Sequence, residues 1–476
     1  MALGRRYSTQ QELFVTIDEI AEAPAHPFYS RLEAVLKFHE FDAFCESLCQ
    51  PHYASEIGRP GLAPGVYFRL MMLGYFERIP SERQIAWRVA DSLSLRQFVG
   101  FSVTKATPDH STISKTRRCL PLSVHNAVFT KVLEILVGES LLKGKRLGMD
   151  ATTLASNASM KALTHNISGK SYRQYIKSLM AEDPNEPDDP TPEEISRFDR
   201  RRKGKKLSNK QWHNPHNRDA KIAKMKDGST HFAEKCEHAV DLQTGAIVAV
   251  TVQGADLGDT TTLDVTLEAA IDNLQSVEQK LTEQQESQPR RPGRPHTRKV
   301  NQTLVADKGY HSAHVCDRLK GQCIQPMISE PKGGRRRWKD NVQQQQAFYA
   351  NRRNVQSEDG KKQMRRRSEL VERPFAHYLN DGGMRRVWLK GHENIAKRLL
   401  LHVAGFNLGL VMRKLLGAAT AKAWVDLAGA YVDFISVIYA HIEHQRANSS
   451  IRIDSHRNFA DDYPVASESA QLLLVA

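Results

Sequence analysis

Residues 145–159 read Lys-Arg-Leu-Gly-Met-Asp-Ala-Thr-Thr-Leu-Ala-Ser-Asn-Ala-Ser, and the interpretation of the whole chain starts from them. A basic pair leads into apolar residues, then a single carboxylate, Asp150, then small and hydroxyl residues. This pattern indicates a buried strand with an acid at its end. A lone aspartate in that place is commonly a turn or cap residue. A functional role for Asp150 therefore depends on partners elsewhere in the chain.

Two further stretches supply carboxylates. Residues 302–310, Gln-Thr-Leu-Val-Ala-Asp-Lys-Gly-Tyr, form a second short apolar strand that ends in Asp307. Glu369 and Glu372 project from a predicted helix beside the basic run 365–367. Carboxylates fixed at strand ends and on a helix are suited to two-metal phosphoryl transfer. Three acids among 54 Asp and Glu residues are a weak signal by spacing alone, and basic runs are commonly solvated loops.

The segments between these acids predict an α/β domain. A hairpin is expected over 231–252 with its turn at Thr244-Gly245. A helix follows Asp259, and a Gln-, Pro- and Arg-rich linker covers 283–299. Strands then alternate with helices, which is typical of α/β rather than sandwich folds. Further elements are expected as a helix over 312–320, a strand over 323–329 and an apolar helix over 391–408.

The region before the Asp150 strand is predicted to be helical. One helix starts at Pro64, a second runs from Ser81 to about Phe98, and a third is capped by Asp109. Short helices with a basic, hydroxyl-rich last member are compatible with a helix-turn-helix reader of DNA. A plain helical bundle with a solvated face fits the pattern equally well.

The charge balance points to a polyanionic partner. The 476 residues carry a net charge of +14, and nucleic acid is the common partner of such proteins. A membrane surface is the weaker reading, since the basic residues do not lie on one amphipathic helix. The apolar stretch 423–440 carries Asp426 and Asp433, which favours a packed helix over a membrane span. Scattered cysteines and the lack of an apolar signal core predict a reduced, cytoplasmic chain.

A polar excursion over 160–230 interrupts the α/β pattern. Its first part is acidic and Pro-rich, and residues 200–206 are strongly basic. No core-forming period runs through it, so an insertion or flexible arm is expected. The basic half could lie along phosphates or be a solvated run balanced by the acidic half.

Several of these stretches together resemble transposases of bacterial insertion sequences, the DDE type of the four/five-like superfamily. Thr107-Pro-Asp-His-Ser111 and residues 58–69 look like the helical N-terminal domain of that family. Residues 149–159 look like its first-Asp motif, and Ala306-Asp-Lys-Gly-Tyr-His311 looks like its second-Asp motif. The region 369–375 looks like its Glu-bearing helix. The order of the pieces is more specific than any one of them.

The resemblance implies an RNase H-like mixed sheet flanked by helices (α+β or α/β), preceded by an all-α, helix-turn-helix-like domain. Asp150, Asp307 and Glu372 would bind two Mg²⁺ ions, for which Mn²⁺ could substitute. The family places Arg four residues before the Glu and Lys seven after it, where this chain has Ser368 and Leu379. Glu369 is the alternative third ligand, since Arg365 fits the Arg position, although Ala376 misses the Lys. The expected divisions are an extension over 1–44, a DNA-binding domain over 45–143, a catalytic domain over 144–416 and a helical tail over 417–476.

The implied function is a DNA transposase that binds terminal inverted repeats, cuts DNA and transfers the strand to a target. It would act as a homo-oligomer on paired ends, in the bacterial cytoplasm at the nucleoid. The alternatives are an RNase H-fold nuclease without strand transfer and a non-catalytic, transposase-derived DNA-binding protein. The residues expected to contact DNA are Lys115, Arg117, Arg118, Arg335, Arg336, Arg337, Arg367, Arg373 and Lys390.

Overall fold

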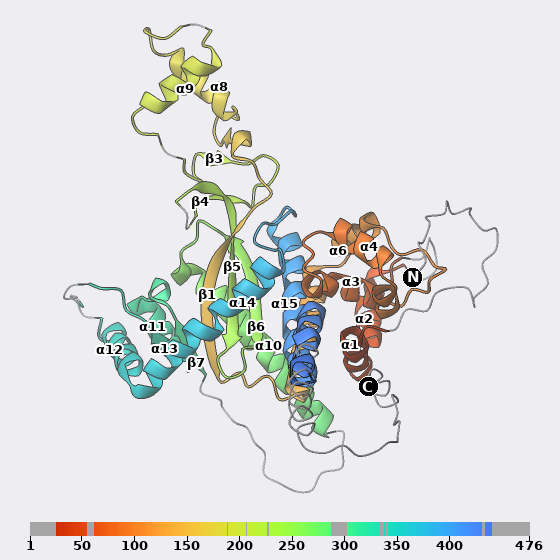
Figure 1. Ribbon diagram of the computed structural model, residues 1–476. Coiled ribbons are helices and arrows are strands. Elements are labelled where there is room, and N and C mark those ends of the chain that lie inside the picture. The colour runs from red at the N-terminus through yellow and green to blue at the C-terminus, as the bar shows by residue number, and fades with distance from the viewer. Residues whose placement is uncertain are drawn as a thin grey trace, which may run out of the picture. The chain divides into compact units, whose positions relative to one another are not determined.

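The computed structural model describes residues 25–54, 61–187, 189–205, 207–225, 228–286, 302–333, 338, 341–430 and 434–439. The chain divides into two compact units, Met1–Lys422 and Ala423–Ala476. The first unit holds the sheet and nearly all of the helices, and it is shown with its labels in Figure 1.

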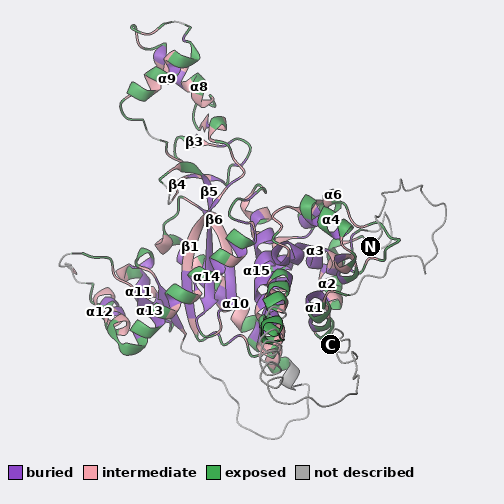
Figure 2. Cartoon of the chain, viewed as in Figure 1, coloured by how far each residue is buried: buried purple, intermediate pink, exposed green. Residues whose placement is uncertain are grey.

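The sheet is built around the strand that carries Asp150. This strand, β1 (Arg146–Ala155), pairs antiparallel with β5 (Thr230–Asp241) and parallel with β7 (Thr303–Ala306). Beyond β5 lies β6 (Ile247–Gly254), and beyond β7 lies β8 (Gln325–Ile328). Five strands follow the order β6-β5-β1-β7-β8, which joins an antiparallel hairpin to a parallel side, and a sixth, β4 (Lys221–Lys224), also pairs antiparallel with β5. The mixed sheet flanked by helices that the resemblance implied is confirmed, and its strands are largely buried (Figure 2).

Helices cover both faces of this sheet. Neighbouring residues of a strand point to opposite faces. On β5, Glu237 contacts one helix through Thr262, while His238 contacts another through the carbonyl of Val371. The two helices therefore lie on opposite faces. The elements of this region are α10 (Asp259–Glu286), a 3-10 turn η4 (Lys308–Tyr310), α11 (Ala313–Gly321), α12 (Val342–Gln356), α13 (Glu358–Leu370), α14 (Glu372–Phe375), a π-helical turn η5 (Ala376–Asp381) and α15 (His392–Leu416).

A buried asparagine closes each edge of the sheet. On β6, the Ile247 N–H donates to Asn407 Oδ1 (3.0 Å), and Asn407 Nδ2 donates back to the Ile247 carbonyl (2.8 Å). On β8, Ile328 makes the same two bonds with Asn351, each 2.8 Å long. An edge strand exposes unpaired backbone groups that favour aggregation. Helices α15 and α12 thus satisfy these groups with side chains.

The N-terminal region is helical, as predicted. Pro64 begins one helix, and the side chains of Ser81 and Asp109 cap two others. The single helix expected from Ser81 to Phe98 is two helices, because Ser92 is extended and caps the second through the Leu95 N–H. The helices are α1 (Pro27–Phe38), α2 (Phe41–Cys49), η2 (Gln50–His52, a 3-10 turn), α3 (Pro64–Phe76), α4 (Glu82–Asp91), α5 (Leu93–Phe98), α6 (His110–Cys119) and α7 (Leu122–Gly138).

Helix α1 lies within the stretch for which we expected only an extension. It buries Phe28, Leu32 and Leu36, so the described part of this stretch contributes to the helical core. The apolar residues recur at helical spacing over little more than three turns, which is too short a signal for a firm prediction. The domain boundary at residue 45 stays a prediction.

The excursion over 160–230 is folded, which corrects the expectation that no core forms there. Leu163, Trp212, Ile222 and Phe232 form one buried cluster, and a second lies between two helices. Pairing between distant residues creates the first cluster, so no local period could reveal it. Figure 1 shows the two helices beyond the β4 end of the sheet. The elements are η3 (Met160–Ala162, a 3-10 turn), β2 (Thr164–His165), α8 (Tyr172–Met180), α9 (Pro192–Arg201), β3 (Trp212–His213) and β4 (Lys221–Lys224).

The second unit is helical where it is described, over 423–430 and 434–439. Phe434 and Tyr439 are more than half exposed, so the packing expected for this stretch is not observed among the described residues. A stretch between His392 and Tyr439, which includes α15, passes a length and composition test for a membrane span. Because 72% of the tested window is buried inside the fold, the same result is typical of a core helix.

Candidate active site

The pairing of β1 with β7 brings the two strand-end acids together. Met149 on β1 is the register partner of Ala306 on β7. The strands are parallel, so the residues that follow, Asp150 and Asp307, lie at the same level on adjacent strands. Both side chains are partly buried. The sequence predicted this adjacency, and the register of the two strands agrees with it.

The segment that carries Glu372 crosses the Asp150 face of the sheet. Gly148 lies on that face, two residues from Asp150, and a Cβ there would approach Val371 Cγ2 to 2.5 Å. His238, the register partner of Asp150, bonds to the Val371 carbonyl at 2.9 Å through Nε2. A glycine on β1 therefore lets Val371 approach, and Glu372 follows directly.

A break in the helix sets where each glutamate lies. Helix α13 ends at Leu370, and α14 begins at Glu372. Pro374 has no N–H to give to the carbonyl of Leu370, which explains the interruption. Glu369 is exposed on α13, and Glu372 is exposed at the start of α14. The two acids therefore belong to different helices rather than to adjacent turns of one.

The charges around Asp150 couple it to the other two acids. Burial raises the pKa of Asp150, whereas the Arg367 guanidinium and the Ala151 N–H lower it, and the charges of Glu372 and Asp307 raise it again. Arg367 is buried, and its Nη2 lies 3.4 Å from Asp150 Oδ2. Two carboxylates thus act on Asp150, and one arginine offsets them.

The donor chemistry of this site fits a hard divalent cation. Three carboxylates supply oxygen ligands, which Mg²⁺ prefers, while it retains several of its waters. Within the residues that the structure describes, no three His, Cys, Asp or Glu side chains are grouped closely enough to hold a metal ion. Arg367 and the Ala151 N–H each contact one oxygen of Asp150. These contacts satisfy the carboxylate in the arrangement observed.

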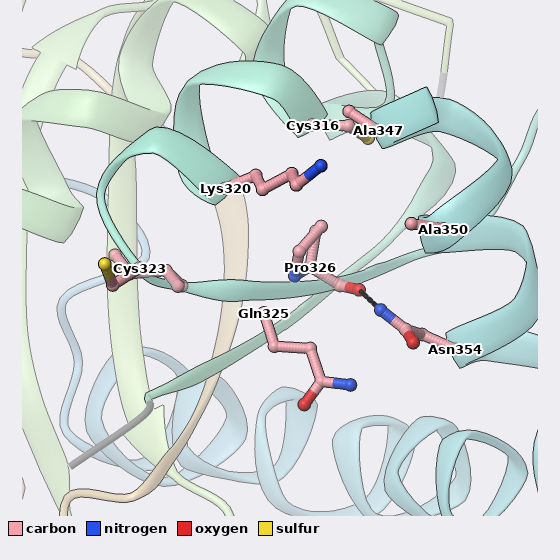
Figure 3. A pocket seen from close by; sticks show the side chains of 9 residues that line it. Cys316, Lys320, Cys323, Gln325, Pro326, Ala347, Ala350 and Asn354 are labelled. Atoms are coloured by element: carbon pink, nitrogen blue, oxygen red, sulfur yellow. Dashed lines mark hydrogen bonds between the residues drawn. The ribbon is translucent and has the colours of Figure 1, made fainter. Parts of the chain in front are cut away.

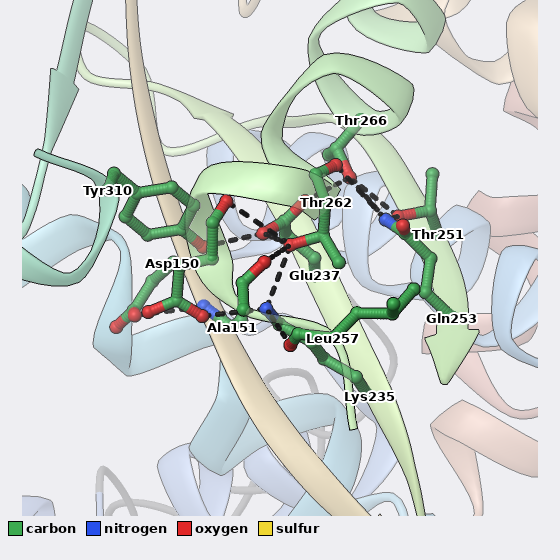
Figure 4. Close-up of polar contacts among 12 residues, drawn as sticks. Asp150, Ala151, Lys235, Glu237, Thr251, Gln253, Leu257, Thr262, Thr266 and Tyr310 are labelled. Carbon is green, nitrogen blue, oxygen red and sulfur yellow. Dashed lines mark hydrogen bonds and ion pairs between the residues drawn. The ribbon is translucent and has the colours of Figure 1, made fainter. Parts of the chain in front are cut away.

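A polar network beneath the second acid was not predicted from the sequence. Buried Glu237 accepts hydrogen bonds from Thr262 (2.9 Å), Thr266 and the Tyr310 hydroxyl (2.7 Å) (Figure 4). Tyr310 is three residues after Asp307, so the network fixes the turn that carries this acid. Burial raises the pKa of Glu237, and the three donors lower it. The only sequence signal was an acid within an apolar strand, which had no visible partner.

His238 has a packing role in this region. Its ring stacks on Phe375 with centroids 3.7 Å apart, and Nδ1 lies 3.2 Å from the Tyr378 hydroxyl. Burial lowers the pKa of His238 to about 3, so the imidazole is neutral. It fixes α14 to β5 through both ring nitrogens.

The residues expected to contact DNA divide into four groups. Lys115, Arg118, Arg373 and Lys390 are exposed. Arg117 is buried and bonds to Glu82, Asn394 and Ser114, so it joins helices and is not available to phosphates. Arg367 is turned to Asp150. Arg335, Arg336 and Arg337 lie outside the described residues.

A pocket of about 390 Å³ lies apart from the acids, between α11, β8 and α12 (Figure 3). Cys316, Lys320, Cys323 and Asn354 are among its lining residues. Asn354 Nδ2 donates one hydrogen bond to the Pro326 carbonyl. None of the three candidate acids lines this pocket, so it is not part of the candidate active site.

The mixed sheet carries two acids at the ends of adjacent parallel strands, and two family models identify the family of the chain. Residues 16–119 match the Transposase domain (DUF772), and residues 271–412 match the Transposase DDE domain. The chain therefore belongs to the transposases with a DDE domain, as the resemblance implied. The second match includes Asp307 and Glu372, while Asp150 lies between the two matches.

Comparisons with individual proteins add little. No curated protein matches the chain. Among solved structures, the Mos1 mariner paired-end complex with Mn is similar at 10% identity and a TM-score of 0.16, covering 74% of this chain and 86% of that one. The Mos1 transposase paired-end complex with left transposon end gives 9% identity, the same TM-score and coverages of 69% and 82%. Similarity at this TM-score supports no conclusion about this chain.

Proposed function

We propose that this protein is the DNA transposase of an insertion sequence, binding the terminal inverted repeats of its element and cutting and joining DNA at the acid site. The observation that carries the proposal is the parallel register of β1 and β7, which sets Asp150 beside Asp307. The segment bearing Glu372 crosses the same face, and the charges of all three acids interact. The net charge of +14 supports a DNA partner.

In this proposal Asp150, Asp307 and Glu372 hold two Mg²⁺ ions, and Mn²⁺ can replace them. The bound ions supply an activated hydroxyl and stabilise the leaving oxygen. The chain itself holds the three carboxylates at fixed positions on two strands and a helix start. Arg367, which now pairs with Asp150, would be available to a phosphate if bound ions took its place beside that carboxylate. Cleavage and strand transfer are both in-line displacements at phosphorus, so one acid cluster serves both.

The helical region contributes end recognition. Lys115 and Arg118 are exposed on α6, one turn apart, and are suited to contact phosphates. Arg373 and Lys390 lie near the acid site along the chain and are also exposed. Two chains acting on paired ends would bring two such sites to the same DNA complex. The homo-oligomer, like the cytoplasmic, nucleoid-associated location, follows from the proposed reaction.

The test uses DNA that carries the sequences flanking the gene, with Mg²⁺ or Mn²⁺. We expect Asp150→Asn, Asp307→Asn and Glu372→Gln each to lower end cleavage by about 1,000-fold or more, because each removes a charge that would stabilise the transition state through a metal. Glu369→Gln is the matched control and should cut near the wild-type rate. If Glu369→Gln lost end cleavage while Glu372→Gln kept it, the third metal-binding acid would be Glu369 instead of Glu372.

The same assay separates the two alternatives. Wild-type protein that cuts ends but never joins pre-cut ends to a target would be a nuclease. Wild-type protein that binds ends and cuts with neither metal would be a DNA-binding protein. Thermal unfolding of each variant distinguishes a lost ligand from a lost fold.

A further inference from the structure

Residues 385–388, Arg-Arg-Val-Trp, are fixed to the far end of the strand that carries Asp150. The Ala155 N–H donates to the Arg385 carbonyl (3.1 Å), and the Val387 N–H donates to the Ala155 carbonyl (2.9 Å). Gly383, with φ of 72°, makes the turn that leads into this segment. A backbone held by the active-site strand is a rigid place for a binding residue.

The Arg385 side chain lies over the face of the sheet that holds Asp150. Its Nη1 donates to Thr152 Oγ1 at 3.0 Å, and its Nε donates to Asn380 Oδ1 at 2.8 Å. Thr152 follows Asp150 by two residues on the same face, which is about 7 Å along the strand. Arg385 is exposed, and its Nη2 has no partner among the described residues.

Trp388 presents an aromatic surface to solvent beside this arginine. The Arg386 guanidinium lies 4.6 Å from the centre of the indole ring, and the residue is still 52% exposed. Asn157 Nδ2 donates to the Trp388 carbonyl at 2.7 Å, which fixes the backbone. Aromatic rings with arginine neighbours are the surfaces on which unpaired bases stack. A fully paired duplex offers no free base face to such a ring.

We propose that segment 385–388 binds an unpaired nucleotide run that leads away from the reacting phosphate. Arg385 and Arg386 contact its phosphates, and Trp388 stacks on one of its bases. The proposal rests on the proposed function, since it assumes DNA at the acid site. It adds a substrate form, DNA with an unpaired strand at the cut site, and it gives Arg385, Arg386 and Trp388 individual roles. The sequence had related residues 382–386 to the region of the Glu-bearing helix without a role for each residue.

The test compares two DNA probes and three variants of the full chain. One probe is a fluorescent duplex with a short single-stranded tail at the element end, and the other is fully paired. We expect Trp388→Ala to weaken binding of the tailed probe by about 5- to 100-fold with little effect on the paired probe, the range given by loss of one stacked base. Trp388→Phe should restore most of the affinity, because it keeps a ring. Tyr349→Ala is the matched control, since Tyr349 is an exposed ring with an arginine 5.3 Å away on α12.

Equal affinity of wild type and Trp388→Ala for the tailed probe would overturn the proposal, as would an equal loss on both probes. A loss in Tyr349→Ala as large as that in Trp388→Ala would also overturn it. The proposed function fails by a different result, namely end cleavage that survives Asp150→Asn. Trp388 is exposed, so its truncation should leave thermal unfolding unchanged, and that measurement accompanies the binding data.

Discussion

Asp150 lies between charges of both signs, and its environment illustrates how single residues fix the site. Glu372 and Asp307 repel it, while Arg367 attracts it across 3.4 Å. A buried carboxylate is costly unless it is paired or hydrogen-bonded. The arginine therefore offsets part of the negative charge of the three acids.

A second ion pair at the residue scale gives a prediction about pH. His392 Nε2 lies 2.6 Å from the buried Glu234 carboxylate, which raises the pKa of His392, while burial lowers it less. When a histidine has a higher pKa in the folded protein than in the unfolded chain, its protonation stabilises the fold. This stabilisation is complete below the pKa of the unfolded chain and disappears as the pH rises through the pKa of the folded protein. Asp219 also raises this pKa, and Lys221 lowers it.

We therefore expect the stability difference between wild type and His392→Gln to be largest near about pH 6 and to shrink by about pH 9. Urea unfolding at both pH values measures it. The exposed His314→Gln is the control and should show no comparable change. A difference that grows with pH would contradict the assignment.

For single residues, the sequence was enough to predict the candidate acids, but it did not predict which buried polar residues bond to one another. The apolar residues before Asp150 and Asp307 were enough to predict strand ends, because burial of a strand leaves a local pattern. The burial of Arg117 was not predictable, since Glu82 and Asn394 are distant in sequence. Glu237 was missed for the same reason. Its three donors come from α10 and the turn after β7.

At the scale of elements, the two edge strands depend on Asn351 and Asn407. Each asparagine is fully buried and bonds to both backbone groups of one strand residue. Truncation leaves a buried N–H and a buried carbonyl without partners.

We expect Asn351→Ala and Asn407→Ala each to lower the free energy of unfolding by about 2–4 kcal/mol, because two buried backbone groups lose their bonds. Urea denaturation measures the change, with the exposed Gln346→Ala as control. Light scattering at partial denaturation should rise in both variants, as an opened edge pairs between chains. If neither Asn351→Ala nor Asn407→Ala changed the free energy of unfolding, water would be making the hydrogen bonds that the asparagine side chains make in wild type.

Element boundaries were the weaker part of the sequence prediction. The hairpin, α10, β7 and α11 lie where residue patterns placed them. The sequence predicted one continuous helix across Ser92 and another across residues 369–375, whereas the structure has a break in each. Ser92 ends one by capping the next, and Pro374 removes the N–H that would bond to Leu370. The signals were present in the sequence, but apolar periodicity continued across both breaks.

At the scale of the whole first unit, Arg398 joins the helical region to the sheet region. It is completely buried on α15 and donates to the carbonyls of Met71 (3.0 Å) and Ile79 (2.9 Å). Gly74 leaves room for the guanidinium, since a Cβ there would clash with it. Burial lowers the pKa of Arg398 to about 10.

We expect Arg398→Met to lower the free energy of unfolding by about 2–4 kcal/mol, because two buried carbonyls lose a charged donor. Unfolding followed by two probes, one in each region, should be coincident in wild type and separate in the variant. The exposed Arg413→Met is the control. Coincident transitions in Arg398→Met would mean that other contacts couple the regions.

The central position of β1 also has a consequence for the order of folding. Its antiparallel partner β5, and β6 beyond it, follow within about 100 residues, whereas β7 begins at Thr303, more than 140 residues after β1 ends. During synthesis, β5 can pair with β1 and β6 before β7 has been made, so the edge of β1 that pairs with β7 has no partner strand until then. The carboxylate of Asp307 reaches Asp150 only when that edge closes, and Glu372 arrives later still. A chain still short of β7 therefore has no assembled acid site, and the three carboxylates come together only after the segment up to Glu372 has been made.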